Sequence, residues 1–224
     1  MYDKEISALT INNIATIEGS LRVIAEVEEV LFKAISLTVK QSVEQYAKES
    51  GVAISEDQAY DFDVTNDDLN LHFGNKSWEY EKVLYAYFTL GHGEERDSRL
   101  GYRWLSHALG EYDSSARLRF IFELDSNHFN KYSGLAAQSY KKAFKDAFEA
   151  VFSGTRDFKL NSGTKDETCI YHEFHLDKEA VASAYPDLNE TSEAMKPVRD
   201  AIQKIIDAHA DFEALVKHIM QEES

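Results

Sequence analysis

The sequence predicts an α+β protein in which a mostly antiparallel sheet of about five to six strands packs against long N-terminal, middle and C-terminal helices. Three observations support this class. Apolar residues recur at steps of three and four near both ends of the chain, which is typical of amphipathic helices. Between these regions, apolar and polar residues alternate in short segments, as in strands with one buried face. A third helical pattern separates the main strand region from a last strand.

We expect a single domain over residues 1–224, because a chain of this length with 43 % hydrophobic residues can bury a core of its own. Gly51 suits the end of the N-terminal helix, and Gly19 with Ser20 is a candidate break within it. The predicted elements are an N-terminal helical region at about 5–50, a sheet region at about 59–126, a helix at about 130–153, a strand at about 168–176 and a C-terminal helix at about 188–221.

Both terminal helices carry an apolar stripe, and we expect them to pack on each other. Each stripe has one polar member, Glu28 and His209 respectively, which we expect to reach water at the margin of its stripe. In the alternative these two residues pair, or the stripes form a homodimer contact through the terminal helices. The stripes consist of Ile14, Ile17, Leu21, Ile24, Leu31 and Ile35, and of Met195, Val198, Ile202, Ile205, His209, Phe212, Val216 and Ile219.

The sheet region contains several patterns of period two. Residues 60–64 and 69–73 alternate on either side of a polar cluster and predict a hairpin. Residues 83–90 are apolar on both faces, which favours a central strand covered on both sides. Apolar and polar side chains alternate over residues 116–125, which predicts a strand with one face in the core and the other exposed to solvent. Residues 100–104 predict either a strand or a short helix.

Charge and cysteine content restrict the class of protein. Forty acidic against 24 basic side chains give a net charge of −16, which disfavours direct binding of nucleic acid. The lone Cys169 cannot form an intrachain disulfide, and this favours a reducing, cytoplasmic location. No stretch approaches 18 uncharged apolar residues, so we expect no membrane partner.

The last predicted strand carries two histidines that resemble a metal motif at first sight. Alternation sends His172 to the face of Ile170, and His175 to the face of Cys169 and Glu173. The two histidines therefore cannot share an ion on a regular strand. We expect His172 to be a hydrogen-bonded core residue, and three ligands on one strand are weak evidence for zinc.

Two loops that follow predicted strands carry the candidate catalytic residues. His92, Glu94 and Asp97 follow the strand at 83–90, while Asp125 and His128 follow the strand at 116–125. Carboxylates and imidazoles at strand ends suit general acid–base work or a divalent metal. The alternative is that both runs are solvated turns or that Asp125 caps a following helix.

The sequence supports two functional hypotheses from different classes. In the first, the chain is an acidic interaction protein that contacts another protein, such as a basic nucleic-acid-binding one, and uses no cofactor. In the second, it is a metal-dependent hydrolase or nuclease that assembles the carboxylates and histidines of the two loops around a divalent metal. A subunit of a larger assembly is a third alternative. The chain lacks the GxxxxGK[ST], GxGxxG, GxSxG and HExxH motifs.

Overall fold

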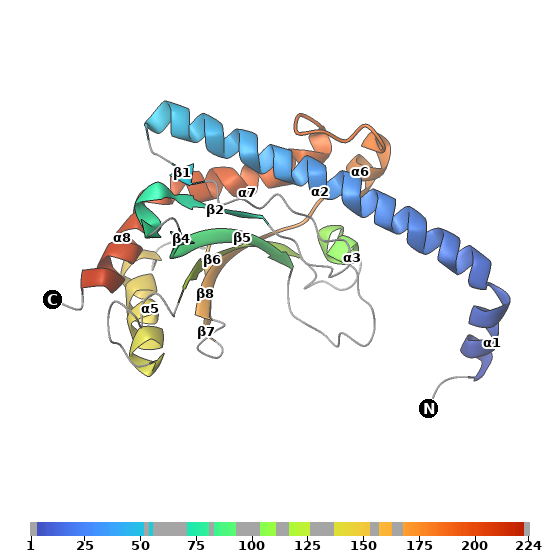
Figure 1. Cartoon of the computed structure of the whole chain (residues 1–224), viewed down its shortest axis with the longest axis horizontal. Helices are drawn as coiled ribbons and strands as arrows, with labels where there is room; N and C mark the ends of the chain where they lie inside the picture. The colour runs from blue at the N-terminus through green and yellow to red at the C-terminus, as the bar shows by residue number, and fades with distance from the viewer. Residues whose placement is uncertain are drawn as a thin grey trace.

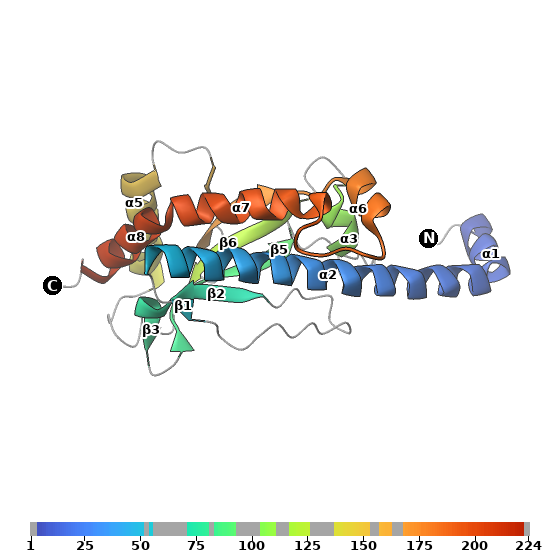
Figure 2. The same ribbon diagram turned by 90° about the horizontal axis from the view of Figure 1, so that it is seen from above.

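The long helices α2 and α7 lie side by side across one face of a curved antiparallel sheet, and α5 and α8 cover one end of that sheet (Figure 1; Figure 2). The computed structural model describes residues 4–51, 54–55, 71–80, 83–92, 104–110, 117–125, 137–152, 157–162 and 168–221. The predicted α+β class is therefore confirmed.

The helices and strands fall in an order close to the one that the sequence predicts. The helices are α1 (Lys4–Asn12), α2 (Ile14–Ser50), α3 (Trp104–Ala108), α5 (Ala137–Phe152), α6 (Lys178–Ala184), α7 (Lys196–Asp207) and α8 (His209–Gln221), with 3₁₀ turns η1 (Lys76–Trp78) and η4 (Glu193–Met195). The strands are β1 (Ile54–Ser55), β2 (His72–Asn75), β3 (Glu79–Tyr80), β4 (Val83–Leu84), β5 (Ala86–His92), β6 (Leu118–Leu124), β7 (Lys159–Ser162) and β8 (Thr168–Phe174).

The described strands form a six-stranded sheet in the order β1-β2-β5-β6-β8-β7, with a separate two-stranded sheet of β3 and β4. All pairs in the larger sheet are antiparallel. In the central register Phe88 lies opposite Phe122, which lies opposite Ile170. These residues share the face under the helices, so one row across three strands belongs to the core.

Strand β6 confirms the clearest strand prediction. Its residues alternate between buried and half-buried, with Phe120 and Phe122 in the core. The outward residues are half-buried rather than fully wet, because the paired strands and their long side chains shield them. Strand β8 follows the same alternation. The hydrophobic pattern therefore fixes which face of the central sheet is buried.

The segment at 83–90 is not the single strand, buried on both faces, that its composition suggests. It bends at Tyr85 into β4 and β5, and β5 then lies between β2 and β6 as a central strand. Ala86, Phe88 and Leu90 are buried, whereas Tyr87 and Thr89 on the other face are half-buried. Tyrosine and threonine are common in strands, so the segment resembles a strand that is buried on both faces. Their hydroxyl groups nevertheless favour a face with access to water.

Two other uncertain segments are partly settled. Trp104 begins the short helix α3, which was the alternative to a strand, and its ring contacts Phe32 edge-on at 6.5 Å between centroids. Residues 100–103 lie outside the described residues, as do residues 60–70 of the predicted hairpin. The described end of that hairpin, from His72, forms β2.

Helix α2 runs without interruption through Gly19 and Ser20, so the predicted break there is wrong. The chain turns instead at Asn13, between α1 and α2. The helix ends as predicted: Gly51 adopts a left-handed conformation (φ 71°), and its N–H donates to the carbonyl of Ala47. Side chains of α2 are buried from Glu28 to Val43, where the helix crosses the sheet.

The predicted C-terminal helix at 188–221 is three shorter elements, η4, α7 and α8. Pro197 occupies the first turn of α7, where its missing N–H costs no hydrogen bond. The predicted helix is interrupted at Ala208, so the two halves of its apolar stripe pack on different helices. Helix α7 packs on α2, and α8 packs on α5. The described residues of this stripe face the interior of the same chain.

The two polar stripe residues behave differently from the expectation. Glu28 is only 1 % exposed, so the prediction that it reaches water is wrong, and His209 is half-buried. They do not pair, because His209 contacts Tyr46, which lies about five helical turns beyond Glu28.

Among the helices in the described ranges, none combines the length and apolar character needed to cross a bilayer.

Candidate functional site: an aromatic pocket

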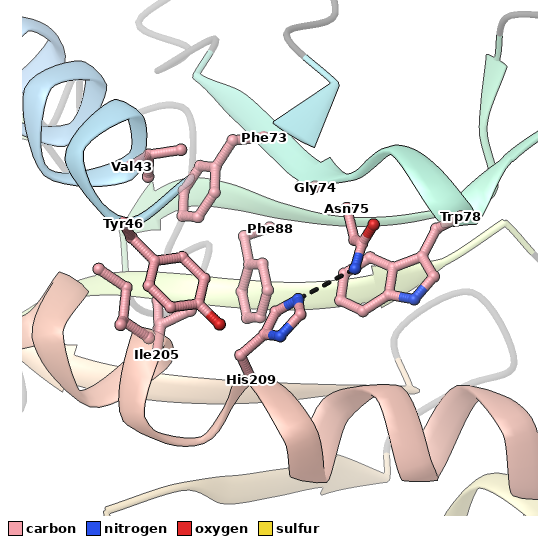
Figure 3. A pocket seen from close by; sticks show the side chains of 10 residues that line it. Val43, Tyr46, Phe73, Gly74, Asn75, Trp78, Phe88, Ile205 and His209 are labelled. Carbon is pink, nitrogen blue, oxygen red and sulfur yellow. Dashed lines mark hydrogen bonds between the residues drawn. The ribbon is translucent and has the colours of Figure 1, made fainter. Parts of the chain in front are cut away.

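A small pocket opens where the end of α2, strand β2 with turn η1, and the junction of α7 and α8 meet (Figure 3). Its cavity volume is about 30 Å³, which is room for one or two water molecules or the tip of a side chain. The lining is mostly aromatic and aliphatic: Val43, Tyr46, Phe73, Gly74, Asn75, Trp78, Phe88, Ile205, Ile206 and His209.

Asn75 is the polar centre of the pocket, and all of its side-chain groups are used. Its amide nitrogen donates to Nε2 of His209 at 3.1 Å and to Oε1 of Glu213 at 2.9 Å. Its carbonyl oxygen accepts from the backbone N–H of Ser77 at 2.9 Å. Because an amide nitrogen can only donate, Nε2 of His209 must be the acceptor, and a neutral ring carries its proton on Nδ1.

Two aromatic rings hold His209 in place. The Trp78 ring stacks on it, with 6.0 Å between centroids and an angle of 26°, and the Tyr46 ring meets it edge-on at 5.5 Å. Burial lowers the pKa of His209, although the nearby Glu213 carboxylate acts in the opposite direction. The neutral form is therefore favoured at pH 7, in agreement with its role as an acceptor from Asn75.

Local sequence explains how these side chains converge. The break at Ala208 makes His209 the first residue of α8, where it lines the pocket together with Ile205 of α7. The passage from β2 into η1 places Asn75 and Trp78 three residues apart on a single turn. Tyr46 comes from the last turns of α2, just before its glycine end. Three segments that are distant in the sequence thus supply one ring each.

The pocket combines aromatic rings with a carboxylate close by. Aromatic faces carry negative electrostatic potential, and a cation within about 6 Å of such a ring gains about 0.5–2 kcal/mol. Glu213, held beside the pocket by Asn75, adds a carboxylate. Val43, Ile205 and Ile206 form an aliphatic wall of the same pocket.

Of the residues predicted for catalysis, the structure describes His92 and Asp125, and neither lines this pocket. His92 ends β5 opposite Leu118, whereas Asp125 follows the other end of β6 and its N–H donates to the carbonyl of Tyr85 at 2.9 Å. His92 pairs with Leu118 at one end of β6, and Asp125 follows the other end of that strand. The two residues are therefore about seven residues, or roughly 23 Å, apart along the strand direction. Glu94, Asp97 and His128 lie outside the described residues.

Strand β8 bears out the interpretation of its core histidine. His172 is buried beneath the helices, and its Nδ1 lies 2.6 Å from the carbonyl oxygen of Asp157, to which it donates. Burial lowers the pKa of His172. On the opposite face, Glu173 accepts from Arg119 and Lys159 instead of joining Cys169 and His175. Within the described ranges, no three of His, Cys, Asp and Glu are grouped so as to hold a metal ion.

Sequence reasoning missed the pocket almost entirely. It marked His209 only as a polar residue in an apolar stripe, and it marked neither Asn75, Trp78 nor Tyr46. A polar residue at a stripe position was a usable signal, because such a residue inside a packed chain needs a hydrogen-bonding partner. The identity of that partner depends on tertiary structure.

Comparisons of this chain with protein-family models, with curated proteins and with solved structures find no match.

Proposed function

We propose that this chain is an interaction protein that binds a positively charged protein, and that the aromatic pocket receives the charged tip of a lysine or arginine side chain of that partner. The observation that carries the proposal is the lining of the pocket: Tyr46, Trp78 and His209 present aromatic rings beside the Glu213 carboxylate. An aromatic site of this kind favours an organic cation over a neutral side chain of similar size.

The charge of the whole chain supports a basic partner. The net charge is −16, and residues 56–68 alone contain six carboxylates and no lysine or arginine. This segment connects β1 to β2, and β1 pairs with the pocket residues Gly74 and Asn75. A basic partner such as a nucleic-acid-binding protein would be attracted to this field before its side chain enters the pocket.

The test uses short peptides rich in lysine or in arginine, with a norleucine peptide of the same length as the uncharged control. Calorimetric titration should give an affinity for the basic peptides that falls as the salt concentration rises, because salt screens exposed charges. The norleucine peptide should not bind. Basic peptides that bind with an affinity indifferent to salt, or that bind no better than norleucine, would contradict the proposal.

Variants of Tyr46 separate the pocket from the general acidity of the chain. Tyr46→Leu removes the aromatic face and should weaken peptide binding by about 2- to 30-fold, which corresponds to the energy of one cation–π contact. Tyr46→Phe keeps the ring and should bind like the wild type. Tyr185→Leu alters an exposed tyrosine at the end of α6 and serves as the matched control. Equal losses in all three variants would rule out a specific role for the pocket.

A further inference from the structure

The N-terminal arm, defined as α1 with residues 14–27 of α2, projects beyond the sheet and the other helices in both views (Figure 1; Figure 2). Large aliphatic side chains on this arm are exposed to water: Leu9 63 %, Ile11 72 %, Ile14 49 %, Leu21 46 % and Val23 50 %. Single exposed aliphatic residues are ordinary on a protein surface. Five of them on one projecting segment are more than isolated residues, and such exposure is typical of an interaction surface.

Two of these five residues, Ile14 and Leu21, continue the stripe that α2 buries further along. At 100° per residue, Ile14, Ile17, Leu21 and Ile24 lie on the same side of the helix as Leu31 and Ile35. Leu31 and Ile35 are fully buried against the body of the protein. On the arm, no other part of the chain that the structure describes covers this apolar face. Its spacing is that of the seam between two paired helices.

Charge indicates which kind of partner covers the arm. Residues 6–25 contain only two charged side chains, Glu18 and Arg22, and their charges cancel. The rest of the chain carries the whole net charge of −16, so two copies repel each other over most of their surface. Residues 6–25 of the arm are a long segment on which a second copy can approach without that repulsion.

We propose that the arm pairs with the arm of a second copy of this chain, antiparallel and about a two-fold axis at the level of residue 19. In this register Ile14 faces Ile24 of the second copy, and Ile17 faces Leu21. The same residues therefore meet from both sides, as a two-fold interface requires. This inference goes beyond the proposed function and does not depend on it.

Glu18 and Arg22, the two charged residues within 6–25, fit this arrangement. Both lie on the same flank of the apolar stripe, at about 40° and 80° from Ile14 around the helix. In an antiparallel pair the same flanks of the two helices meet, so Glu18 of one copy lies close to Arg22 of the other. Within one chain Arg22 contacts Glu26 at 3.8 Å, and its side chain is 80 % exposed and available to a second copy.

Mass measurement by light scattering over a concentration series tests the proposal on the full chain. The wild type should approach twice the chain mass of 25.5 kDa as concentration rises. Leu21→Glu should weaken the dimer by at least about tenfold, because it places a carboxylate in the seam. Val23→Glu is the matched control: it adds the same charge at similar exposure, but about 200° around the helix, and should alter the dimer by no more than about twofold.

Charge reversal tests the antiparallel register. Glu18→Arg and Arg22→Glu should each weaken the dimer, and the double variant should restore it, because the opposite charges then meet again. Failure of the double variant to recover would overturn the antiparallel pairing. A wild type that stays at 25.5 kDa at every concentration, or that sediments with phosphatidylcholine vesicles as a monomer, would overturn the second copy as the occupant. The peptide titrations report on the pocket separately, since Leu21→Glu leaves the pocket residues unchanged.

Discussion

The side-chain amide of Asn75 bridges the ring of His209 and the carboxylate of Glu213, and so joins the edge region of the sheet to the first turn of α8. Both of its N–H groups are used, and its carbonyl oxygen holds the backbone N–H of Ser77. This single residue fixes the orientation of the histidine, the carboxylate and the turn that carries Trp78. Three of the features that define the pocket therefore depend on one buried amide.

Asn75→Ala should lower the free energy of unfolding by about 2–3 kcal/mol, because it leaves the half-buried His209 and Glu213 without these hydrogen bonds. Urea unfolding followed by circular dichroism measures this change. Asn189→Ala removes an amide that bonds only within an exposed turn, and should cost less than half as much. Equal losses in the two variants would show that Asn75 contributes no more than a surface turn residue.

Acid should destabilise the protein through His209. Burial lowers its folded-state pKa below the ordinary value of 6.5, so the unfolded chain takes up a proton first as the pH falls. The free energy of unfolding should therefore fall as the pH drops below about 6.5, and level off once the folded state also binds the proton. Protonation also places an N–H on Nε2 against the Asn75 amide.

Unfolding measured at a series of pH values checks this linkage. His209→Gln should flatten the profile between about pH 7 and 5, because the titrating group is gone. His172, whose pKa burial also lowers, should contribute in the same direction, so the double variant should be flatter still. A stability that rises on acidification in this window would contradict the account.

Arg119 should matter more than an ordinary surface charge. Its Nε and Nη2 atoms donate to Glu173 at 3.1 and 2.8 Å, and its guanidinium group lies 4.5 Å from the centre of the Tyr171 ring. Arg119→Ala should lower the free energy of unfolding by about 1–2 kcal/mol. Lys145→Ala breaks an exposed pair with Glu149 and should cost less than about 0.5 kcal/mol.

The same cluster predicts a second acid transition. Burial acts to raise the pKa of Glu173, but the hydrogen bonds and charges of Lys159 and Arg119 together lower it below its ordinary value of 4.5. Its stabilising contribution is present above pH 4.5 and is lost as the pH falls through the lowered folded-state pKa. In Arg119→Ala this loss should be smaller, which unfolding measurements below pH 5 would detect.

The central sheet should be sensitive to truncation at Phe122. Its ring is fully buried and contacts Trp78 at 5.6 Å, Phe88 at 5.0 Å and Phe212 at 4.8 Å between centroids. Phe122→Ala should cost about 3–5 kcal/mol, from lost burial and the cavity left behind. Ile121→Ala, on the half-buried face, should cost clearly less. Comparable losses at the two positions would mean that the face beneath the helices is not the main core.

Local pattern was enough to predict the strands around Phe122 and His172, because alternation directly reports which face is buried. It could not predict the break at Ala208, which divides one apolar stripe between two packing partners. It also placed His92 and Asp125 in similar loops without the strand order that separates them. The pocket depends on residues 46, 75 and 209, and their meeting is decided by packing across the whole chain.

The two tryptophans provide the most direct test that the pocket receives a cationic side chain, because Trp78 lines it while Trp104 is buried in α3. In nitrogen-15 spectra, a lysine-rich peptide should shift the indole signal of Trp78 saturably and leave that of Trp104 in place. The norleucine peptide should shift neither signal. A lysine-rich peptide that leaves Trp78 unmoved, or a norleucine peptide that shifts it equally, would contradict the proposed function.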